Sequence, residues 1–393
     1  MSLRVLIVPD KFKGTLTARA AAHAIAHGWG RERPRDSLEL LPMTDGGDGF
    51  GEVMGGLLRA RPQRIKTTNA EHHPCHATWW WDAQTQTAIV ESAQVIGLAT
   101  LPPGQSHPLN RDTFGLGKLL RAARAKGAQQ ILVGVGGSAT NDGGFGLARA
   151  VGWEFLDANG KAIVQWTELH RLVEMRPPRP RASGRITVAV DVQNPLLGTR
   201  GATRVYGPQK GLRAEDLRLA EKCLRRLATV ARRHFGRDFA KLPGAGAAGG
   251  LGFGLLAFLG AESEPGFELF ARHAKLNRHL RAADLIITGE GAIDRSTLMG
   301  KGAGEIARRC RVRKISCLGL AGSLAPALRR NQLFSELRAV TDLTTGRRAK
   351  ANPAFWLERL AARAARHFQA GSAAATQART RRPLPQGFNL HLR

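Results

Sequence analysis

Short runs of apolar, largely β-branched residues recur along the chain, with longer helical stretches between them. The predicted strands are Leu3–Val8, Glu39–Leu41, Ile131–Val135, Ile186–Val190, Leu285–Thr288, Ile315–Leu320 and Ala339–Thr341. The predicted helices are Thr17–Trp29, Gly51–Arg59, Phe114–Lys126, Ala214–Phe235, Gly302–Arg309 and Pro353–Phe368. This alternation indicates parallel strands joined by helical crossovers, and the nearly all-apolar strands indicate sheets covered on both faces.

The pattern changes at residues 77–92. Ala77–Trp81 and Thr87–Glu91 flank the polar turn Asp82–Gln86, which is typical of an antiparallel hairpin. We therefore predict an α/β fold of two domains. Residues 1–70 and 283–370 would form a discontinuous Rossmann- or flavodoxin-like domain with a parallel sheet, and residues 71–282 an inserted mixed α/β domain. Residues 371–393 are basic and without acidic residues, which predicts a flexible tail.

The net charge of the 393-residue chain is +28, which would attract polyanions. The arginines are spread along the sequence with few aromatic residues beside them, and no helix-turn-helix, zinc finger or RNA-binding aromatic motif is present. We interpret the charge as solvated arginine-rich surface and expect no specific nucleic-acid partner. A basic nucleic-acid-binding protein is the least favoured alternative.

Residues 242–261 carry no charge and are long enough to span a bilayer. Their seven glycines and one proline instead favour a glycine-rich loop that leads into a buried helix. The N-terminal apolar run is too short for a signal peptide, and the four cysteines form no CxxC pair. We expect a cytoplasmic protein without membrane contact. His72, His73, Cys75 and His76 lack a second ligand pair at a usual spacing, so a polar loop is favoured over a zinc site there.

Candidate chemistry lies in four loops that follow predicted strands, where ligands of open α/β sheets bind. In the first loop, residues 9–17, Lys13 and the helix amides would bind an anion, and Asp10 could orient a cation. The alternative is ordinary helix capping by Thr15 or Thr17. The second loop, residues 43–49, combines Asp45 and a second aspartate with three glycines; its alternative is a tight turn capped by Asp45.

The third loop, residues 134–144, holds five glycines, two hydroxyls, an amide and a carboxylate, more than a turn requires. Its backbone N–H groups are predicted to form a phosphate-binding nest. The candidate binding residues are Gly136, Gly137, Ser138, Thr140, Asn141 and Asp142. No P-loop motif is present, and the G-x-G-x-x-G at residues 244–249 follows a proline rather than a clear strand.

The fourth region begins at Asp191, at the end of an apolar strand, and continues to Lys210. A carboxylate at such a strand end is expected to be paired, metal-bound or catalytic.

Together these segments resemble the glycerate kinase family that includes the bacterial glycerate 2-kinases. The resemblance covers residue 1 to about 370 and rests on VPDKFKGTLTA, LPMTDGGDG, GVGGSATNDGG, DVQNPLLGTRGA, YGPQKG, LPGAGAAGGLGFGLLAFLGA and ADLIITGEGAID. It implies a two-domain α/β enzyme that uses MgATP to phosphorylate D-glycerate, with 2-phosphoglycerate favoured over 3-phosphoglycerate as product. Assembly into a homo-oligomer is left open.

Departures from the family pattern occur at Ser92–Ile96, at Ser106–Lys118 and at Ala292, where relatives usually have an arginine. That substitution removes a bidentate donor, which Lys301 replaces only as a point charge. The departures favour the alternatives of a relative that phosphorylates another hydroxy acid or binds a ligand without catalysis.

Phosphoryl transfer depends chiefly on positioning and charge neutralisation. The third loop and Lys13 are predicted to hold phosphate or carboxylate oxygens, and Asp45 and Asp294 to orient Mg²⁺. Asp191 would act as the base that aligns the acceptor hydroxyl, and Lys210 would grip the substrate carboxylate. The predicted catalytic residues are thus Asp191, Lys13 and Asp45.

Overall fold

The computed structural model describes residues 2–101, 106–179, 184–298, 302–329 and 332–369. The chain forms two compact units, Met1–Asp45 with Phe270–Arg393, and Gly46–Leu269. Each unit has its own main β-sheet. The predicted tail and Lys301 lie outside the described residues.

The sheet of the first unit is parallel throughout. In spatial order its strands are β13 (Glu336–Ala339), β12 (Ser316–Leu324), β11 (Leu285–Ile293), β1 (Arg4–Pro9) and β2 (Ser37–Leu40). Numbered along the chain within this unit, the order is 2-1-3-4-5, which is the flavodoxin-like order. The reversal of strand order lies between β1 and β11, where Val5 pairs with Leu285.

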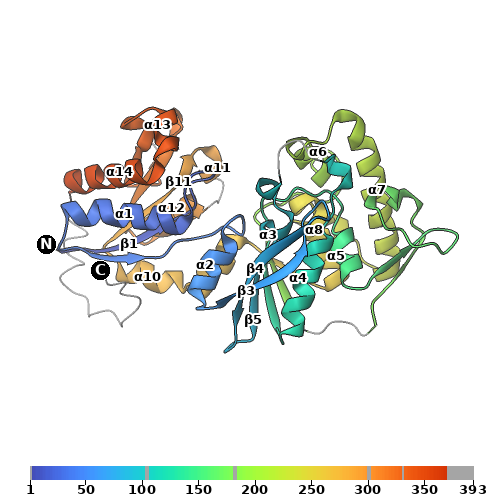
Figure 1. The fold of residues 1–393 in the computed structure, drawn as a ribbon. Helices are drawn as coiled ribbons and strands as arrows, with labels where there is room; N and C mark the ends of the chain where they lie inside the picture. The colour runs from blue at the N-terminus through green and yellow to red at the C-terminus, as the bar shows by residue number, and fades with distance from the viewer. Residues whose placement is uncertain (1, 102–105, 180–183, 299–301, 330–331, 370–393) are drawn as a thin grey trace. The chain divides into compact units, whose positions relative to one another are not determined.

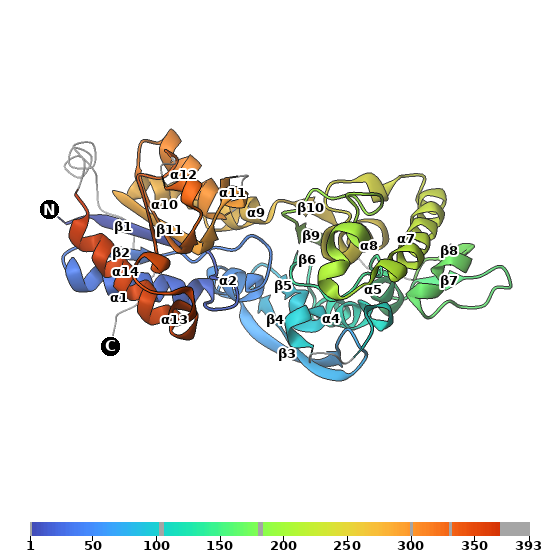
Figure 2. The same ribbon diagram turned by 90° about the horizontal axis from the view of Figure 1, so that it is seen from above.

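Helices cover both faces of this sheet (Figures 1 and 2). Helices α1 (Ala18–Glu32) and α14 (Pro353–His367) pack together on one face, in a cluster that includes Val5 and Ile7. Successive residues of a strand point to opposite faces, so Leu6 is buried on the other side, towards α10 (Leu276–Ala282) and α12 (Gly302–Val312). The remaining helices of this unit are α11 (Arg295–Leu298) and α13 (Gly346–Ala351), while α9 (Gly266–His273) spans the boundary between the units.

The main sheet of the second unit is mixed. Its strands in order are β10 (Glu262–Glu264), β9 (Arg185–Ala189), β6 (Gln130–Gly134), β5 (Thr87–Glu91), β4 (Pro74–Asp82) and β3 (Arg61–Thr68). The first four are parallel, and β4 and β3 are antiparallel to their neighbours. The predicted hairpin is therefore confirmed as β4–β5. A separate two-stranded sheet pairs β7 (Glu154–Leu156) with β8 (Glu174–Arg176).

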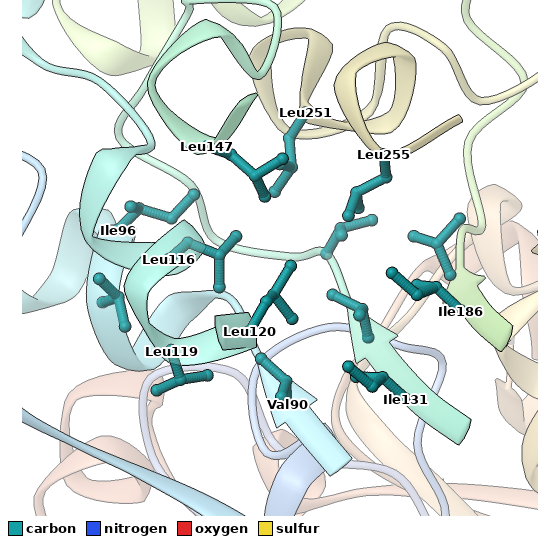
Figure 3. Close-up of a cluster of buried hydrophobic side chains, with 14 of the residues drawn as sticks. Val90, Ile96, Leu116, Leu119, Leu120, Ile131, Leu147, Ile186, Leu251 and Leu255 are labelled. Carbon is teal, nitrogen blue, oxygen red and sulfur yellow. The ribbon is translucent and has the colours of Figure 1, made fainter. Parts of the chain in front are cut away.

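Three helices cover one face of the mixed sheet, namely α4 (Phe114–Ala125), α5 (Phe145–Ala150) and α8 (Ala247–Leu259). Figure 3 shows their leucines packed over Val90, Ile131 and Ile186. On the other face, α2 (Phe50–Leu57) packs against β4 and β5. The long helix α7 (Ala214–Phe235), whose bounds match the prediction, closes a second apolar cluster with α5 and α8. The short helices of this unit are α3 (Ala93–Ile96) and α6 (Ala202–Tyr206).

The structure confirms the predicted α/β fold with one parallel and one mixed sheet. Its units divide at Asp45/Gly46 and Leu269/Phe270, whereas residues 70/71 and 282/283 were the predicted boundaries. Residues 46–70 belong to the second unit because β3 pairs along its length with β4. Residues 270–282 belong to the first unit, where α10 packs on β1.

Two further segments can be compared directly with the sequence prediction. The strand predicted at Ala339–Thr341 lies at Glu336–Ala339 in the structure, so the prediction was wrong for residues 340 and 341. These residues begin a turn of 3-10 helix, because the Asp342 carboxylate accepts from the Ala339 N–H at 3.1 Å. The uncharged segment 242–261 contains the buried helix α8, as predicted. Among the described residues, no helix is long and apolar enough to cross a membrane.

Two adjacent glycines of α2 make a direct test of how this helix packs. A methyl group on Gly55 would lie 2.5 Å from Cδ1 of Trp80, whereas one on Gly56 would meet nothing within 4 Å. We expect Gly55→Ala to lower the free energy of unfolding by about 1–3 kcal/mol through overpacking. Gly56→Ala should raise it by about 0.5–1 kcal/mol through helix propensity. Equal effects of the two substitutions in urea unfolding would contradict the close contact.

Candidate active site

In the first unit, the loop after β1 lies at the point where the strand order reverses, the usual ligand site of such sheets. The Asp10 N–H donates to the Gly289 carbonyl at 2.8 Å, which holds the loop against the end of β11. A Cβ atom on Gly291 would lie 3.1 Å from the backbone nitrogen of Lys13, which is a tight contact, so the glycine lets the two segments approach closely. The sequence therefore builds a tight junction here from one aspartate and two glycines.

Asp10 is buried at this junction. One carboxylate oxygen accepts from the Lys11 N–H at 2.7 Å, and the other lies near Gly302, the first residue of α12. Burial and the charge of Asp45 raise the pKa of Asp10 to about 8, with a smaller contribution from Glu290 and an opposing one from Lys11. The loop thus concentrates more negative charge than its own lysine neutralises.

Asp45 completes this group, because its Oδ1 lies 3.3 Å from Lys11 Nζ. Among the described residues, no three His, Cys, Asp or Glu side chains are grouped as a metal site. Magnesium, however, usually takes only one or two carboxylates and fills its shell with water and substrate phosphates. The raised pKa of Asp10 indicates that an added cation would be stabilised here, so Asp10 and Asp45 fit Mg²⁺.

The other predicted residues of the first unit are exposed. Asp294 accepts from the Ser296 N–H at 2.7 Å and begins α11, so its carboxylate acts as the helix N-cap. Lys13 makes no hydrogen bond or ion pair with any described residue, so its ammonium faces solvent. Ala292, at the position of the usual family arginine, is also exposed.

In the second unit, the third loop joins β6 to α5 and is organised around Asp142. Its fully buried carboxylate accepts four hydrogen bonds, from the Thr113 N–H and hydroxyl and from the Gly144 and Gly146 N–H groups. Burial first, and then Asp112, raise the pKa of Asp142 to about 6, while these donors oppose the rise. Asp142 therefore fixes the loop and the starts of α4 and α5 and has no oxygen directed at solvent.

The hydroxyls of the loop are also engaged. Ser138 Oγ and Thr140 Oγ1 lie 3.0 Å apart, and the Ser138 hydroxyl donates to the Ala248 carbonyl at 3.2 Å. Asn141 donates to Thr203 Oγ1 at 3.0 Å, but its side-chain oxygen is buried without a hydrogen-bond partner among the described residues. The Asn141 oxygen is therefore the polar group of the loop that a ligand or water would satisfy.

Lys210 reaches the same loop from the 3-10 turn Pro208–Lys210. Its buried ammonium donates to the Thr140 carbonyl at 2.6 Å. Burial lowers the pKa of Lys210 to about 7, and Asp142 opposes this fall. The structure thus brings Lys210 and the predicted loop together, through a backbone carbonyl.

This approach depends on an unusual backbone segment at the start of α8. Ala248, Gly249 and Gly250 all have positive φ, at 52°, 72° and 86°. A side chain on Gly249 would lie 1.9 Å from the Thr140 carbonyl oxygen and 2.8 Å from Lys210 Nζ. Left-handed backbone at a non-glycine residue such as Ala248 is strained and tends to occur at functional sites.

The sequence analysis missed Glu91, at the end of β5. Its buried carboxylate accepts from the Gly49 and Gly51 N–H groups, each at 3.0 Å, and thereby anchors the start of α2. In the same region, Gly136 and Gly137 lie directly against Gly47 and Asp48. The signal in the sequence was the position of an acidic residue at the end of an apolar strand, the same signal that selected Asp191.

Asp191 is exposed just beyond β9, and its Oδ1 accepts from the Gly266 N–H at 2.9 Å. The predicted site residues thus form two groups. The first unit holds Asp10, Lys13, Asp45 and Asp294, and the second holds Gly136, Gly137, Ser138, Thr140, Asn141, Asp142, Asp191 and Lys210. Most of these residues follow the carboxyl ends of strands in their own sheet, whereas Lys210 reaches the third loop from a 3-10 turn.

Comparison with known proteins gives consistent matches. Residues 5–369 match the Glycerate kinase family. A glycerate kinase of Halalkalibacterium halodurans is 39% identical over 325 residues, which cover 81% of this chain and 85% of that protein. The glycerate 2-kinase of Escherichia coli K12 is 36% identical over 326 residues, covering 82% and 86%. A crystal structure assigned as glycerate kinase 2 from Salmonella typhimurium LT2 gives a TM-score of 0.80 at 34% identity, covering 93% of this chain and 98% of that one.

The buried Asp10 carboxyl predicts a specific pH dependence. Its folded pKa of about 8 exceeds the ordinary value of 3.8, so between these pH values the folded chain holds a proton that the unfolded chain has lost. Its contribution to stability is therefore complete below about pH 4 and declines until about pH 8. Asp10→Asn should become more stable than the wild type as the pH rises through this range. One unit of pKa is worth about 1.4 kcal/mol, so the gain at pH 8 should be a few kcal/mol.

Thermal unfolding of both proteins from pH 4 to pH 8, without divalent cations, measures the difference. Glu358→Gln removes a partly exposed carboxylate of the same unit and serves as the control. A constant difference between Asp10→Asn and wild type across this range would show that Asp10 is ionised throughout.

Proposed function

Since the chain belongs to the glycerate kinase family, we propose that it transfers the γ-phosphoryl group of ATP to D-glycerate with Mg²⁺ and releases 2-phosphoglycerate. Membership of the family makes the chain a phosphotransferase. The glycerate 2-kinase among its relatives supports transfer to the 2-hydroxyl. The observation that carries the proposal is the buried Asp10 beside Asp45 and Lys11, at the point where the strand order of the first sheet reverses.

Asp10 and Asp45 would hold Mg²⁺ in this proposal. When bound, the cation would neutralise negative charge on the phosphates of the nucleotide. This pair replaces the predicted pair of Asp45 and Asp294, because the Asp294 carboxylate already caps α11. Lys13, with its exposed ammonium close to the same loop, is suited to bind a phosphate oxygen.

The second unit would contribute the acceptor-side groups. The exposed Asp191 carboxylate keeps one oxygen on the Gly266 N–H, which orients the side chain, and we assign it as the base that aligns the acceptor hydroxyl. Lys210 is buried on the Thr140 carbonyl, so it would act on the anionic substrate through the third loop instead of gripping the carboxylate from solvent. Asp142 positions that loop.

Asp191→Asn is expected to lower kcat by about 10²–10⁴-fold, the usual contribution of a general base. The asparagine oxygen can still accept from the Gly266 N–H, so the loop should keep its structure. ADP release with D-glycerate, ATP and Mg²⁺ measures the rate, and coupling to enolase identifies 2-phosphoglycerate. Unchanged turnover would remove Asp191 from the mechanism, and turnover only with another hydroxy acid would replace D-glycerate as substrate.

The metal assignment predicts that Asp45→Asn raises the Mg²⁺ concentration needed for half-maximal rate at least tenfold, equivalent to about 1.4 kcal/mol of binding energy. The rise in melting temperature on adding Mg²⁺ should shrink in the same variant, a readout independent of turnover. Asp294→Asn is the matched control. A larger effect in Asp294→Asn than in Asp45→Asn would return the metal to the pair predicted from the sequence.

A further inference from the structure

The second unit contains a cavity of about 580 Å³, and none of the site residues described above lines it. Its floor includes Ile131 and Ile186, which lie at the starts of β6 and β9. The third loop leaves β6 from the opposite end, after Gly134. The cavity therefore lies at the amino-terminal edge of the parallel strands, away from the groups of this unit assigned to phosphoryl transfer.

The walls of the cavity are largely apolar. Four aromatic residues contribute to them, namely Trp153, Phe235, Phe239 and Phe258. Leu120 of α4 also lines the cavity, together with Ile131 and Ile186, and all three belong to the buried cluster drawn in Figure 3. The volume falls within the range of pockets that bind small organic molecules, and such walls would exclude water from an apolar ligand body.

Two positively charged residues, Arg121 and Arg124 of α4, also line the cavity. Arg124 is half-buried, and its guanidinium donates to the carbonyls of Ala128 and Gly184 at 2.9 and 2.8 Å. Arg121 donates to the Ala150 carbonyl at 3.4 Å. Neither forms an ion pair with a described residue, and no described acidic side chain lines the cavity.

This arrangement fixes two guanidinium groups without providing an opposite charge. Carbonyl acceptors orient a guanidinium but do not neutralise it, and the partial burial of Arg124 makes its charge costly, whereas Arg121 is exposed. Burial lowers the pKa of Arg124, with no carboxylate to oppose the shift. An anion at the mouth of the cavity would satisfy this positive charge, while the aromatic walls would accept an uncharged tail.

We propose that this cavity is a binding site for an apolar monocarboxylate, whose carboxylate pairs with Arg121 and Arg124 and whose hydrocarbon body enters the aromatic pocket. The site is distinct from the D-glycerate site in chemistry, because glycerate carries hydroxyl groups and has no hydrocarbon body to bury. Its occupancy does not depend on the proposed phosphoryl transfer.

Decanoate is a suitable probe. Its binding to the full chain can be measured by isothermal titration calorimetry and by the change in fluorescence of Trp153. The Trp153→Phe variant gives the fluorescence of the other tryptophans, which is subtracted. We expect saturable binding at one site per chain. Decanol, which has the same chain without the charge, should bind at least tenfold more weakly. Saturating D-glycerate and MgATP should leave the decanoate affinity within about twofold.

Two kinds of variant distinguish the contribution of the arginine charges to decanoate binding from that of the apolar cavity. Arg121 is exposed, so Arg121→Met removes one charge without altering the core and should weaken decanoate binding about five- to tenfold. Arg124→Met should have at least the same effect. Val151→Phe places a larger ring in the cavity wall and should abolish binding, while kinase activity without decanoate confirms that the variant folds.

Four results would overturn the proposal. The first three are the absence of saturable decanoate binding, equal affinity for decanoate and decanol, and unchanged decanoate affinity in both Arg121→Met and Arg124→Met. Displacement of decanoate by D-glycerate would place the probe at the active site and would overturn it as well.

Discussion

The buried carboxylate of Asp142 is the interaction on which the second unit depends. It accepts hydrogen bonds from the Thr113 N–H at the start of α4 and from the Gly144 and Gly146 N–H groups at the start of α5. The Thr113 hydroxyl donates to the same carboxylate and accepts from the Leu147 N–H, which closes the network. First-turn amides of a helix have no partner within the helix, and one buried carboxylate here serves two helices. The path of the glycine loop between β6 and α5 follows from that constraint.

Backbone donors also distinguish the acidic residues at the strand ends from one another. Glu91 binds two N–H groups and Asp142 binds three with a hydroxyl, so these carboxylates are committed to holding loops. Asp10 receives one N–H and lies close to a second carboxylate, Asp45. Burial and the charge of Asp45 raise the free energy of its charged form, and the single Lys11 N–H opposes them only in part. The same residue type therefore holds a loop in the second unit, whereas in the first unit we propose that it binds a cation.

The sequence predicted most of the fold, because strands covered on both faces are apolar and stand out along the chain. It did not predict β3 (Arg61–Thr68), an edge strand with polar side chains and a proline, since its pairing with β4 is a tertiary interaction. Glycine-rich loops after strands located the candidate residues, but composition could not count the hydrogen bonds on each carboxylate. Asp142 was thus predicted to bind phosphate, whereas in the structure its oxygens accept from Thr113 and from the N–H groups at the start of α5.

Lys210 shows how charge and backbone geometry are linked in the third loop. Burial favours its neutral form and the nearby Asp142 favours its charged form. The effect of burial is the larger, so the pKa of Lys210 is lowered to about 7. A phosphate or carboxylate that reached the loop would add to the effect of Asp142 and raise that pKa. The ammonium can occupy this position only because Gly249 has no side chain and a positive φ of 72°. A side chain at that position would displace the Thr140 carbonyl, and the lysine would lose the acceptor that makes its burial tolerable.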